Sequence, residues 1–163
     1  MDQCTKAALL CIAVSNDIWY MHLYADGEDF DKSHELTQEY YHRLSSEADF
    51  LMELAIELKE SVPNPSTALQ YLSDFSPETD LKSYDYTKVI MRCYEKISRY
   101  VNALQNFRDS NSRTDIQSRI DDILSFWRKE LNYKLIRRSN LKSVMLNGFV
   151  DTGLDTYVSQ QQY

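Results

Sequence analysis

Hydrophobic residues recur every three or four positions along most of this chain, in segments that cover residues 4–24, 30–61, 83–109 and 113–138. Such spacing places the hydrophobic side chains on one face of an α-helix. We therefore predict four long amphipathic helices. The second has the longest hydrophobic stripe, made of Phe30, His34, Thr37, Tyr41, Leu44, Ala48, Leu51, Ala55 and Leu58.

The connections between these segments predict how the helices are arranged. Asp29 is placed to cap the second helix, and Pro63 and Pro65 end it, because proline cannot continue a helix. The connection that follows is long, and residues 66–75 within it have the pattern of a short helix. Short loops join antiparallel neighbours, whereas a long connection permits a crossover. The expected fold is an all-α, ferritin-like four-helix bundle with a short extra helix in the crossover between the second and third helices.

The end of the chain differs in composition from the helical part. Residues 139–163 are polar with scattered hydrophobic residues, and they contain two of the three glycines. A chain of 163 residues is long enough for one domain with a substantial core. We predict that this domain covers residues 1–138 and that an extended C-terminal arm follows it.

Overall composition narrows the classes of function. The net charge is −7 and no run of lysine or arginine is longer than a pair, which disfavours binding to the phosphates of DNA. No segment approaches the roughly 18 apolar residues that span a bilayer, and the N-terminus lacks a signal-peptide pattern. The cysteines, Cys4, Cys11 and Cys93, match no zinc-binding spacing and suit a reducing compartment. We therefore expect a cytoplasmic protein that binds neither DNA nor membranes.

One side of the second helix combines residue types that bind metals. Histidine and carboxylate side chains are the common protein ligands of first-row transition metals. At 100° per residue, four polar residues lie within about 100° of one another around the helix axis. They are His34, Gln38, Asp49 and Glu53, and His22 precedes them near the end of the first helix.

The spacing of these residues along the helix separates them into two halves. The His34–Gln38 pair and the Asp49–Glu53 pair are centred fifteen residues apart, which is about 22 Å along the axis. Metal ligands lie at about 2.0–2.3 Å, so one ion cannot contact both pairs within one chain. Antiparallel packing of two copies of this helix across a two-fold axis would bring the halves together twice. The spacing therefore predicts a site between subunits.

A set of residues along the first two helices resembles the signature of the Dps proteins, the mini-ferritins. The residues that carry the resemblance are His22, Gly27, Phe30, His34, Tyr41, Ala48, Asp49 and Glu53. The resemblance covers residues 7–137 and includes the proline-containing exit at 62–65 and the short helix after it. The arm after residue 138 lies outside it, and the lysine-rich tails that some members use on DNA are absent.

The resemblance implies an iron site shared by two subunits, with ligands from both: His22 and His34 from one, Asp49 and Glu53 from its two-fold mate. It implies a ferroxidase that oxidises Fe(II) with peroxide or dioxygen. It further implies that two-fold dimers assemble into a dodecameric shell, which stores ferric iron and protects against peroxide damage. Zinc or another divalent metal could occupy the same ligands.

Gln38 departs from the family pattern at a position that affects the chemistry. Family members usually carry aspartate four residues after the second histidine, and an amide is a neutral, weaker ligand than a carboxylate. Leu23 also replaces a tryptophan that often follows the first histidine. The alternative is therefore a catalytically silent or weakly metal-binding Dps-like oligomer with a structural or partner-binding role.

Other polar groups have a functional interpretation and a simpler one. Glu39-x-x-His42 matches an element of di-iron bundles, but those proteins need two copies, so a solvated helix face is expected. Asp121, Asp122 and Glu130 could help nucleate mineral if they faced a cavity, although a charged surface is the expected role. The twelve tyrosines are spread over every helix, which favours core and interface packing over stacking on bases.

Overall fold

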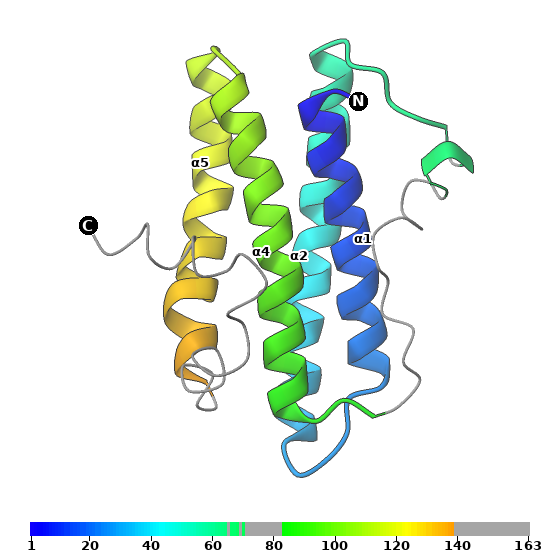
Figure 1. Ribbon diagram of the computed structural model, residues 1–163, viewed down its shortest axis with the longest axis vertical. Coiled ribbons are helices and arrows are strands. Elements are labelled where there is room, and N and C mark those ends of the chain that lie inside the picture. The colour runs from blue at the N-terminus through cyan, green and yellow to red at the C-terminus, as the bar shows by residue number, and fades with distance from the viewer. Residues whose placement is uncertain (65, 69, 71–82, 139–163) are drawn as a thin grey trace, which may run out of the picture.

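The computed structural model describes residues 1–64, 66–68, 70 and 83–138 (Figure 1). Long helices account for most of the described chain. Their bounds are Gln3–Leu23 for α1, Phe30–Glu57 for α2, Tyr86–Ser110 for α4 and Thr114–Lys129 for α5, which continues into the π-helix η1 at Glu130–Leu135. The all-α class predicted from the sequence is confirmed.

The four long helices pack as two antiparallel hairpins, α1 with α2 and α4 with α5 (Figure 1). The end of α2 and the start of α4 lie at opposite ends of the bundle, so these two helices run in the same direction. Two hairpins related in this way, with one long connection between them, are typical of ferritin-like bundles. The predicted four-helix bundle is therefore the observed fold.

The second helix ends four residues earlier than predicted, before either proline. Lys59 adopts a left-handed conformation with φ of 59°. Two backbone hydrogen bonds form around it. The Lys59 amide donates to the Ile56 carbonyl at 3.0 Å, and the Glu60 amide donates to the Ala55 carbonyl at 2.9 Å. This pair of bonds is a Schellman motif, which ends a helix by satisfying its last carbonyls. The turn geometry, and not proline, sets the boundary.

Glu60 links the end of this hairpin back to its beginning. Its carboxylate accepts hydrogen bonds from the backbone amides of Cys4 at 3.3 Å and Thr5 at 2.8 Å, and from the Thr5 hydroxyl at 2.9 Å. The first amides of a helix have no partner within it, and the helix dipole favours a negative charge there. Glu60 therefore caps α1 from the far end of α2.

Part of the predicted crossover and all of the predicted arm lie outside the described residues. Residues 66–68 and 70 are helical, where the sequence predicted the short helix. Asn64 caps this turn, because its side-chain oxygen accepts from the Thr67 amide at 3.0 Å. The rest of the predicted short helix and the arm at 139–163 lie beyond the part of the chain that the structure describes.

The buried face of α2 is rotated relative to the predicted stripe. Leu44, Leu51 and Ala55 are buried as expected, but Phe30 is 42% exposed. Tyr40, Glu47 and Leu54 are buried, although the predicted stripe omits them. Because α2 contacts both α1 and α4, its buried face is wider than one stripe and turns toward the second hairpin.

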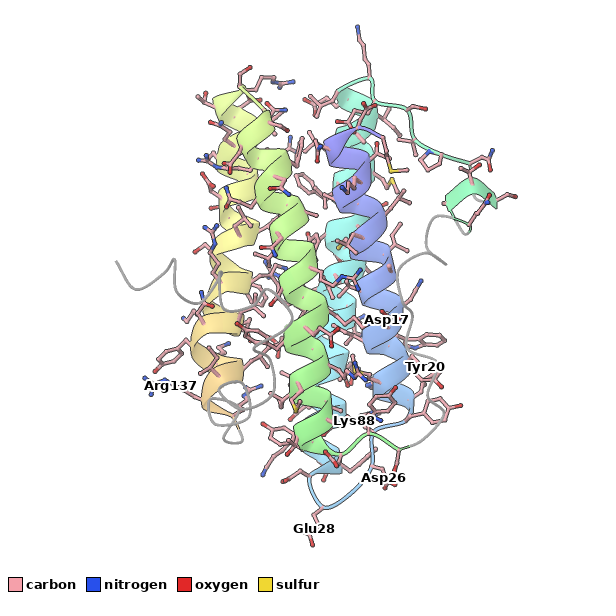
Figure 2. All side chains as sticks on the ribbon, in the orientation of Figure 1. Asp17, Tyr20, Asp26, Glu28, Lys88 and Arg137 are labelled. Atoms are coloured by element: carbon pink, nitrogen blue, oxygen red, sulfur yellow. The ribbon has the colours of Figure 1, made fainter. Side chains whose placement is uncertain are left out.

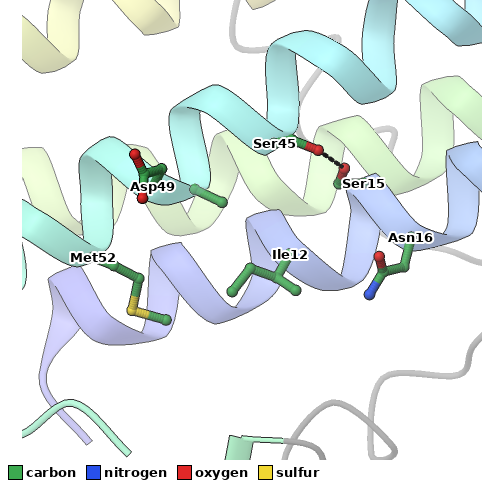
Figure 3. Close-up of a pocket in the computed structure, with 7 residues that line it drawn as sticks. Ile12, Ser15, Asn16, Ser45, Asp49 and Met52 are labelled. Atoms are coloured by element: carbon green, nitrogen blue, oxygen red, sulfur yellow. Dashed lines mark hydrogen bonds between the residues drawn. The ribbon is translucent and has the colours of Figure 1, made fainter. Parts of the chain in front are cut away.

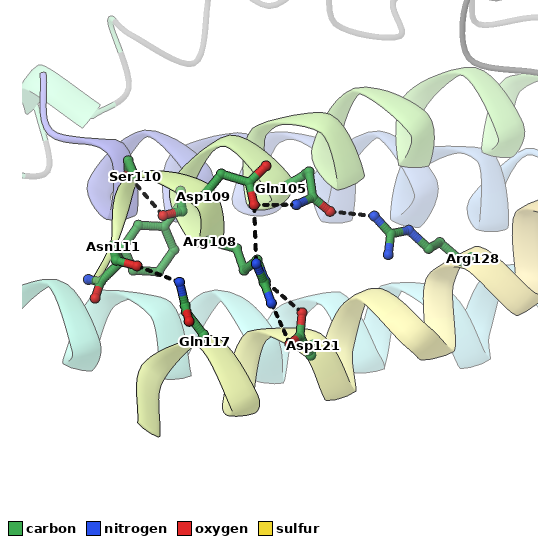
Figure 4. Close-up of polar contacts among 9 residues, drawn as sticks. Gln105, Arg108, Asp109, Ser110, Asn111, Gln117, Asp121 and Arg128 are labelled. Carbon is green, nitrogen blue, oxygen red and sulfur yellow. Dashed lines mark hydrogen bonds and ion pairs between the residues drawn. The ribbon is translucent and has the colours of Figure 1, made fainter. Parts of the chain in front are cut away.

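Two ion pairs connect helices of the bundle and supplement the packing of its hydrophobic core. Asp17 lies on α1 (Figure 2), and its carboxylate forms a buried ion pair with Lys96 on α4 at 3.1 Å. Along the outer side of α4 and α5, Arg108 donates to both carboxylate oxygens of Asp121 at 2.8 and 3.0 Å (Figure 4). The first contact connects the hairpins and the second connects the two helices of one hairpin.

Among the described residues, no helix has the length and hydropathy needed to cross a membrane.

Candidate functional site

The structure brings the two histidines singled out from the sequence into contact. The imidazole rings of His22 and His34 stack with centroids 3.8 Å apart and 28° between their planes. Phe30 lies beside the His34 ring at 5.0 Å, and Tyr41 meets the edge of the His22 ring at 5.2 Å. The end of α1 and the first turns of α2 therefore build a small aromatic cluster around two imidazoles.

Hydrogen bonds determine which nitrogen of His22 can bind a ligand. Its Nδ1 lies 3.1 Å from the carbonyl oxygen of His34 and 3.2 Å from the hydroxyl of Thr37. A carbonyl oxygen only accepts, so Nδ1 carries the proton and Nε2 keeps its lone pair. Histidine ligands of metals commonly donate their other nitrogen to a backbone carbonyl in this way.

The Nδ1 nitrogen of His34 is a second candidate for binding a ligand. This atom is buried and has no hydrogen-bond partner among the described residues. A buried polar atom without a partner costs free energy, so such atoms in native proteins usually have a ligand or water bound. Together, His22 and His34 present one free lone pair through Nε2 and one unpartnered nitrogen.

Burial keeps His22 neutral, which is the form that binds a metal. Removal from water lowers the pKa of the His22 imidazole below its ordinary value of 6.5; the bond to His34 opposes this change, and the neighbouring imidazoles add to it. The effect on stability follows from linkage. A base whose pKa is depressed in the folded state contributes stability that is present above the unfolded-state pKa and is lost as pH falls through the folded-state pKa.

We expect an NMR titration to place the pKa of His22 below 6.5. The ring-proton signal that disappears in His22→Gln identifies the residue. The same variant should flatten the dependence of unfolding free energy on pH in the acidic range below that value. A His22 signal that titrates at or above the ordinary imidazole pKa would contradict this prediction.

The carboxylate half of the predicted site lies farther along α2 and faces solvent. Asp49, Glu53 and Gln38 are all exposed. Asp49 borders a groove of about 290 Å³ between the outer faces of α1 and α2 (Figure 3). Hydrogen bonds between the Ser15 and Ser45 hydroxyls, at 2.9 Å, and from Ser15 to the Tyr41 carbonyl, at 3.1 Å, hold the helices together beneath it.

The described part of one chain does not assemble a complete metal site. Within the described ranges, no group of three or more histidine, cysteine, aspartate or glutamate side chains could hold an ion. The continuous helix from Phe30 to Glu57 keeps the histidine and carboxylate halves apart, as the spacing predicted. The stacked rings also direct their lone pairs in nearly parallel planes, so one ring must turn before both bind a single ion.

The other polar groups considered from the sequence fall into two classes. Glu39 and His42 are exposed on α2, as expected for a solvated face. The expectation that Glu130 lies on a charged surface is wrong. It is 2% exposed, its Oε2 accepts from the Tyr40 hydroxyl at 2.7 Å, and Lys134 pairs with Oε1 at 2.5 Å. The π-helix η1 begins at this residue, which lies three positions after the buried Trp127.

Glu47 is a buried polar residue that the sequence reasoning missed. Its carboxylate accepts hydrogen bonds from Trp127 at 2.7 Å, Tyr100 at 3.1 Å and Arg43 at 2.7 Å. Burial raises its pKa above the ordinary value, and the three donors oppose that change. The available signal was its spacing, three residues after Leu44 and four before Leu51, within the hydrophobic stripe.

Comparison with known proteins identifies a fold. No protein-family model and no curated protein matches the chain. Among solved structures, the crystal structure of antigen TpF1 from Treponema pallidum is similar, with a TM-score of 0.74 and 19% sequence identity. The match covers 82% of this chain and 86% of that chain. Similarity at this level of identity shows that the two proteins share a fold.

Proposed function

We propose that this chain is a Dps-like protein that binds Fe(II) between two subunits, oxidises it and stores the ferric product. The observation that carries the proposal is the contact between His22 and His34, each with a nitrogen suited to a metal. Histidine and carboxylate ligands suit iron, and a metal ion held by them can bind and orient the oxidant. In this proposal the iron is substrate, and peroxide or dioxygen accepts its electrons.

The outer face of the α1–α2 hairpin supports a subunit contact. Trp19 on α1 is 49% exposed, and Ile56 on α2 is 65% exposed. The groove beside Asp49 lies on the same hairpin. Two-fold packing of this face on a second copy would cover these residues and place the histidines of each chain near the carboxylates of the other. Such dimers would then build the dodecameric shell.

The buried thiols support a location in the cytoplasm. Cys4, Cys11 and Cys93 are buried thiols and not disulfides, and the first two donate to the backbone carbonyls of Leu51 and Leu44. Free thiols persist in a reducing compartment. We therefore propose a cytoplasmic location.

Addition of Fe(II) and hydrogen peroxide to the purified full-length protein should accelerate iron oxidation over buffer and leave a soluble ferric product. Asp49→Ala with Glu53→Ala should reduce the rate to that of buffer, because it removes the charged half of the site. Asp109→Ala with Asp115→Ala removes two exposed carboxylates from the other hairpin and should leave the rate unchanged. Oxidation no faster than in buffer would refute the activity.

A mixed assembly tests whether the site is shared. One variant carries His22→Ala with His34→Ala, and the other carries Asp49→Ala with Glu53→Ala. Each is expected to be inactive alone. Unfolded together and refolded, they should regain activity, because each mixed dimer contains one site with both sets of ligands. Inactive mixed dimers, with normal assembly by light scattering, would contradict a site between subunits.

The second candidate function is an assembly that binds iron weakly or does not oxidise it. Gln38, exposed one turn after His34, is the observation that favours it. This hypothesis predicts stable oligomers without stoichiometric iron. It also predicts that Gln38→Asp increases the rate of iron oxidation, since the substitution adds a charged oxygen ligand.

A further inference from the structure

A layer of polar and oxidisable side chains crosses the centre of the bundle, with residues from three helices. Glu47 on α2 accepts hydrogen bonds at one carboxylate oxygen, Oε2, from Trp127 on α5 and from Tyr100 on α4. Arg43 donates to the other oxygen. Trp127 and Tyr100 are fully buried, and Glu47 is 7% exposed. Both aromatic donors therefore share one proton acceptor inside the core.

The aromatic rings in this layer lie close enough for electrons to move between them. The ring of Tyr100 lies 6.5 Å from that of Trp127, and the ring of Tyr40 lies 5.3 Å from it on another side. Tyr40 also donates its hydroxyl to a buried carboxylate, that of Glu130. Indole and phenol are the protein side chains that lose one electron most readily, together with thiols. A phenol does so most easily when a base can take its proton.

We propose that Trp127, Glu47 and Tyr100 form an electron-transfer relay that holds one oxidising equivalent as a buried tyrosyl radical. A one-electron oxidant of the hydroxyl-radical or metal-oxidant class first removes an electron from the Trp127 indole. Tyr100 then gives an electron to the indole cation radical and its hydroxyl proton to Oε2 of Glu47. The products are neutral Trp127, the neutral oxygen radical of Tyr100 and the carboxylic acid of Glu47.

The electrostatics of the core favour this sequence. Glu47 and the two aromatic residues carry one negative charge before oxidation and none afterwards, so the buried carboxylate is neutralised when the electron leaves. Burial already raises the pKa of Glu47 and favours its protonated form. Burial also raises the pKa of Tyr100 well above its ordinary value, so this phenol does not lose its proton alone. Electron loss and proton transfer to Glu47 are therefore coupled.

A surface groove gives an oxidant access to the layer. It has a volume of about 400 Å³ and lies between α2 and α5. Arg43, Glu47 and Phe50 line part of it, and the Arg43 guanidinium carbon lies 5.9 Å from the centroid of the Trp127 ring. An oxidant in this groove is separated from the indole by side chains and not by a whole helix. The relay does not depend on metal binding at the histidines.

Flash photolysis of the full-length protein with tris(bipyridine)ruthenium and persulfate generates a Ru(III) oxidant and tests the relay without iron. Transient absorbance and electron paramagnetic resonance of frozen samples should show a long-lived tyrosyl radical. Its yield should fall by about tenfold or more in Tyr100→Phe, and by a similar factor in Glu47→Gln, which can accept a hydrogen bond but not a proton. Formation of the radical should be slower in deuterated solvent.

Tyr133→Phe is the matched control, because it removes a phenol that is 54% exposed and should leave the long-lived signal unchanged. Circular dichroism and thermal melts check that each variant folds. If a core variant fails to fold, the lifetime of the radical in the unmodified protein and its solvent isotope effect decide whether the relay exists. Only short-lived radicals, or formation without a solvent isotope effect, would refute the relay. A long-lived radical that persists in folded Tyr100→Phe would assign it to another residue and also overturn the proposal.

Discussion

Replacement of Trp127 by alanine should destabilise the protein by about 3–5 kcal/mol, the usual cost of deleting a large aromatic side chain from a core. Trp127 is fully buried, packs edge-to-face on Tyr40 and Phe126, and donates its indole N–H to Glu47. The substitution leaves a cavity and removes one donor from a buried carboxylate. Urea denaturation followed by far-ultraviolet circular dichroism, at one protein concentration, measures the change in unfolding free energy.

Two comparisons make this prediction specific. Trp127→Phe keeps most of the hydrophobic volume and loses only the donor, so it should cost less than alanine. Tyr133→Ala removes an aromatic side chain that is 54% exposed and should change the free energy of unfolding by about 0.5 kcal/mol or less. If Trp127→Ala lost as little unfolding free energy as Tyr133→Ala, the core would not be packed around the indole.

Lys96→Met should also cost about 3–5 kcal/mol, because it removes the positive charge that pairs with the buried carboxylate of Asp17. The pair joins α1 to α4, with the Lys96 and Asp17 side chains 5% and 10% exposed. Methionine keeps the hydrophobic stem of lysine, so the loss of unfolding free energy measures mainly the effect of removing the charge. Chemical denaturation of the variant and the unmodified protein under matched conditions gives the difference.

The double variant distinguishes a charge effect from a packing effect. Asp17→Asn combined with Lys96→Met removes both charges. This double variant should recover more than half of the unfolding free energy that Lys96→Met alone loses. Lys32→Met is the surface control, because the side chains of the Lys32–Asp29 pair are 69% and 43% exposed, and it should cost much less stability than Lys96→Met. A double variant no more stable than Lys96→Met alone would show that packing, and not the unpaired charge, causes the loss.

The fold was predictable because long helices with hydrophobic stripes leave few arrangements open. Periodicity located all four long helices, and loop lengths predicted the two hairpins. The contact between His22 and His34 was also predictable, since both residues flank the short loop between consecutive antiparallel helices. The pairing of Asp49 and Glu53 with histidines of another subunit stays a prediction.

The buried polar residues were harder to predict, for two physical reasons. A carboxylate inside a hydrophobic stripe, such as Glu47, is usually assigned to the surface because burying a charge is costly. Its indole and phenol donors come from helices distant in sequence, so no local pattern reveals them. Glu130 was assigned to the surface for the same reason, although it lies three residues after the buried Trp127, and its donor Tyr40 comes from another helix.

The bond from Glu60 to the first turn of α1 has a consequence for the order of folding during synthesis. The first helix leaves the ribosome well before residue 60, so its leading amides at Cys4 and Thr5 cannot bind the Glu60 carboxylate while α2 is still being made. That acceptor arrives only when all of α2 has emerged. The newly made chain therefore gains its complete helix start and its first hairpin together, as one unit on which the second hairpin can pack.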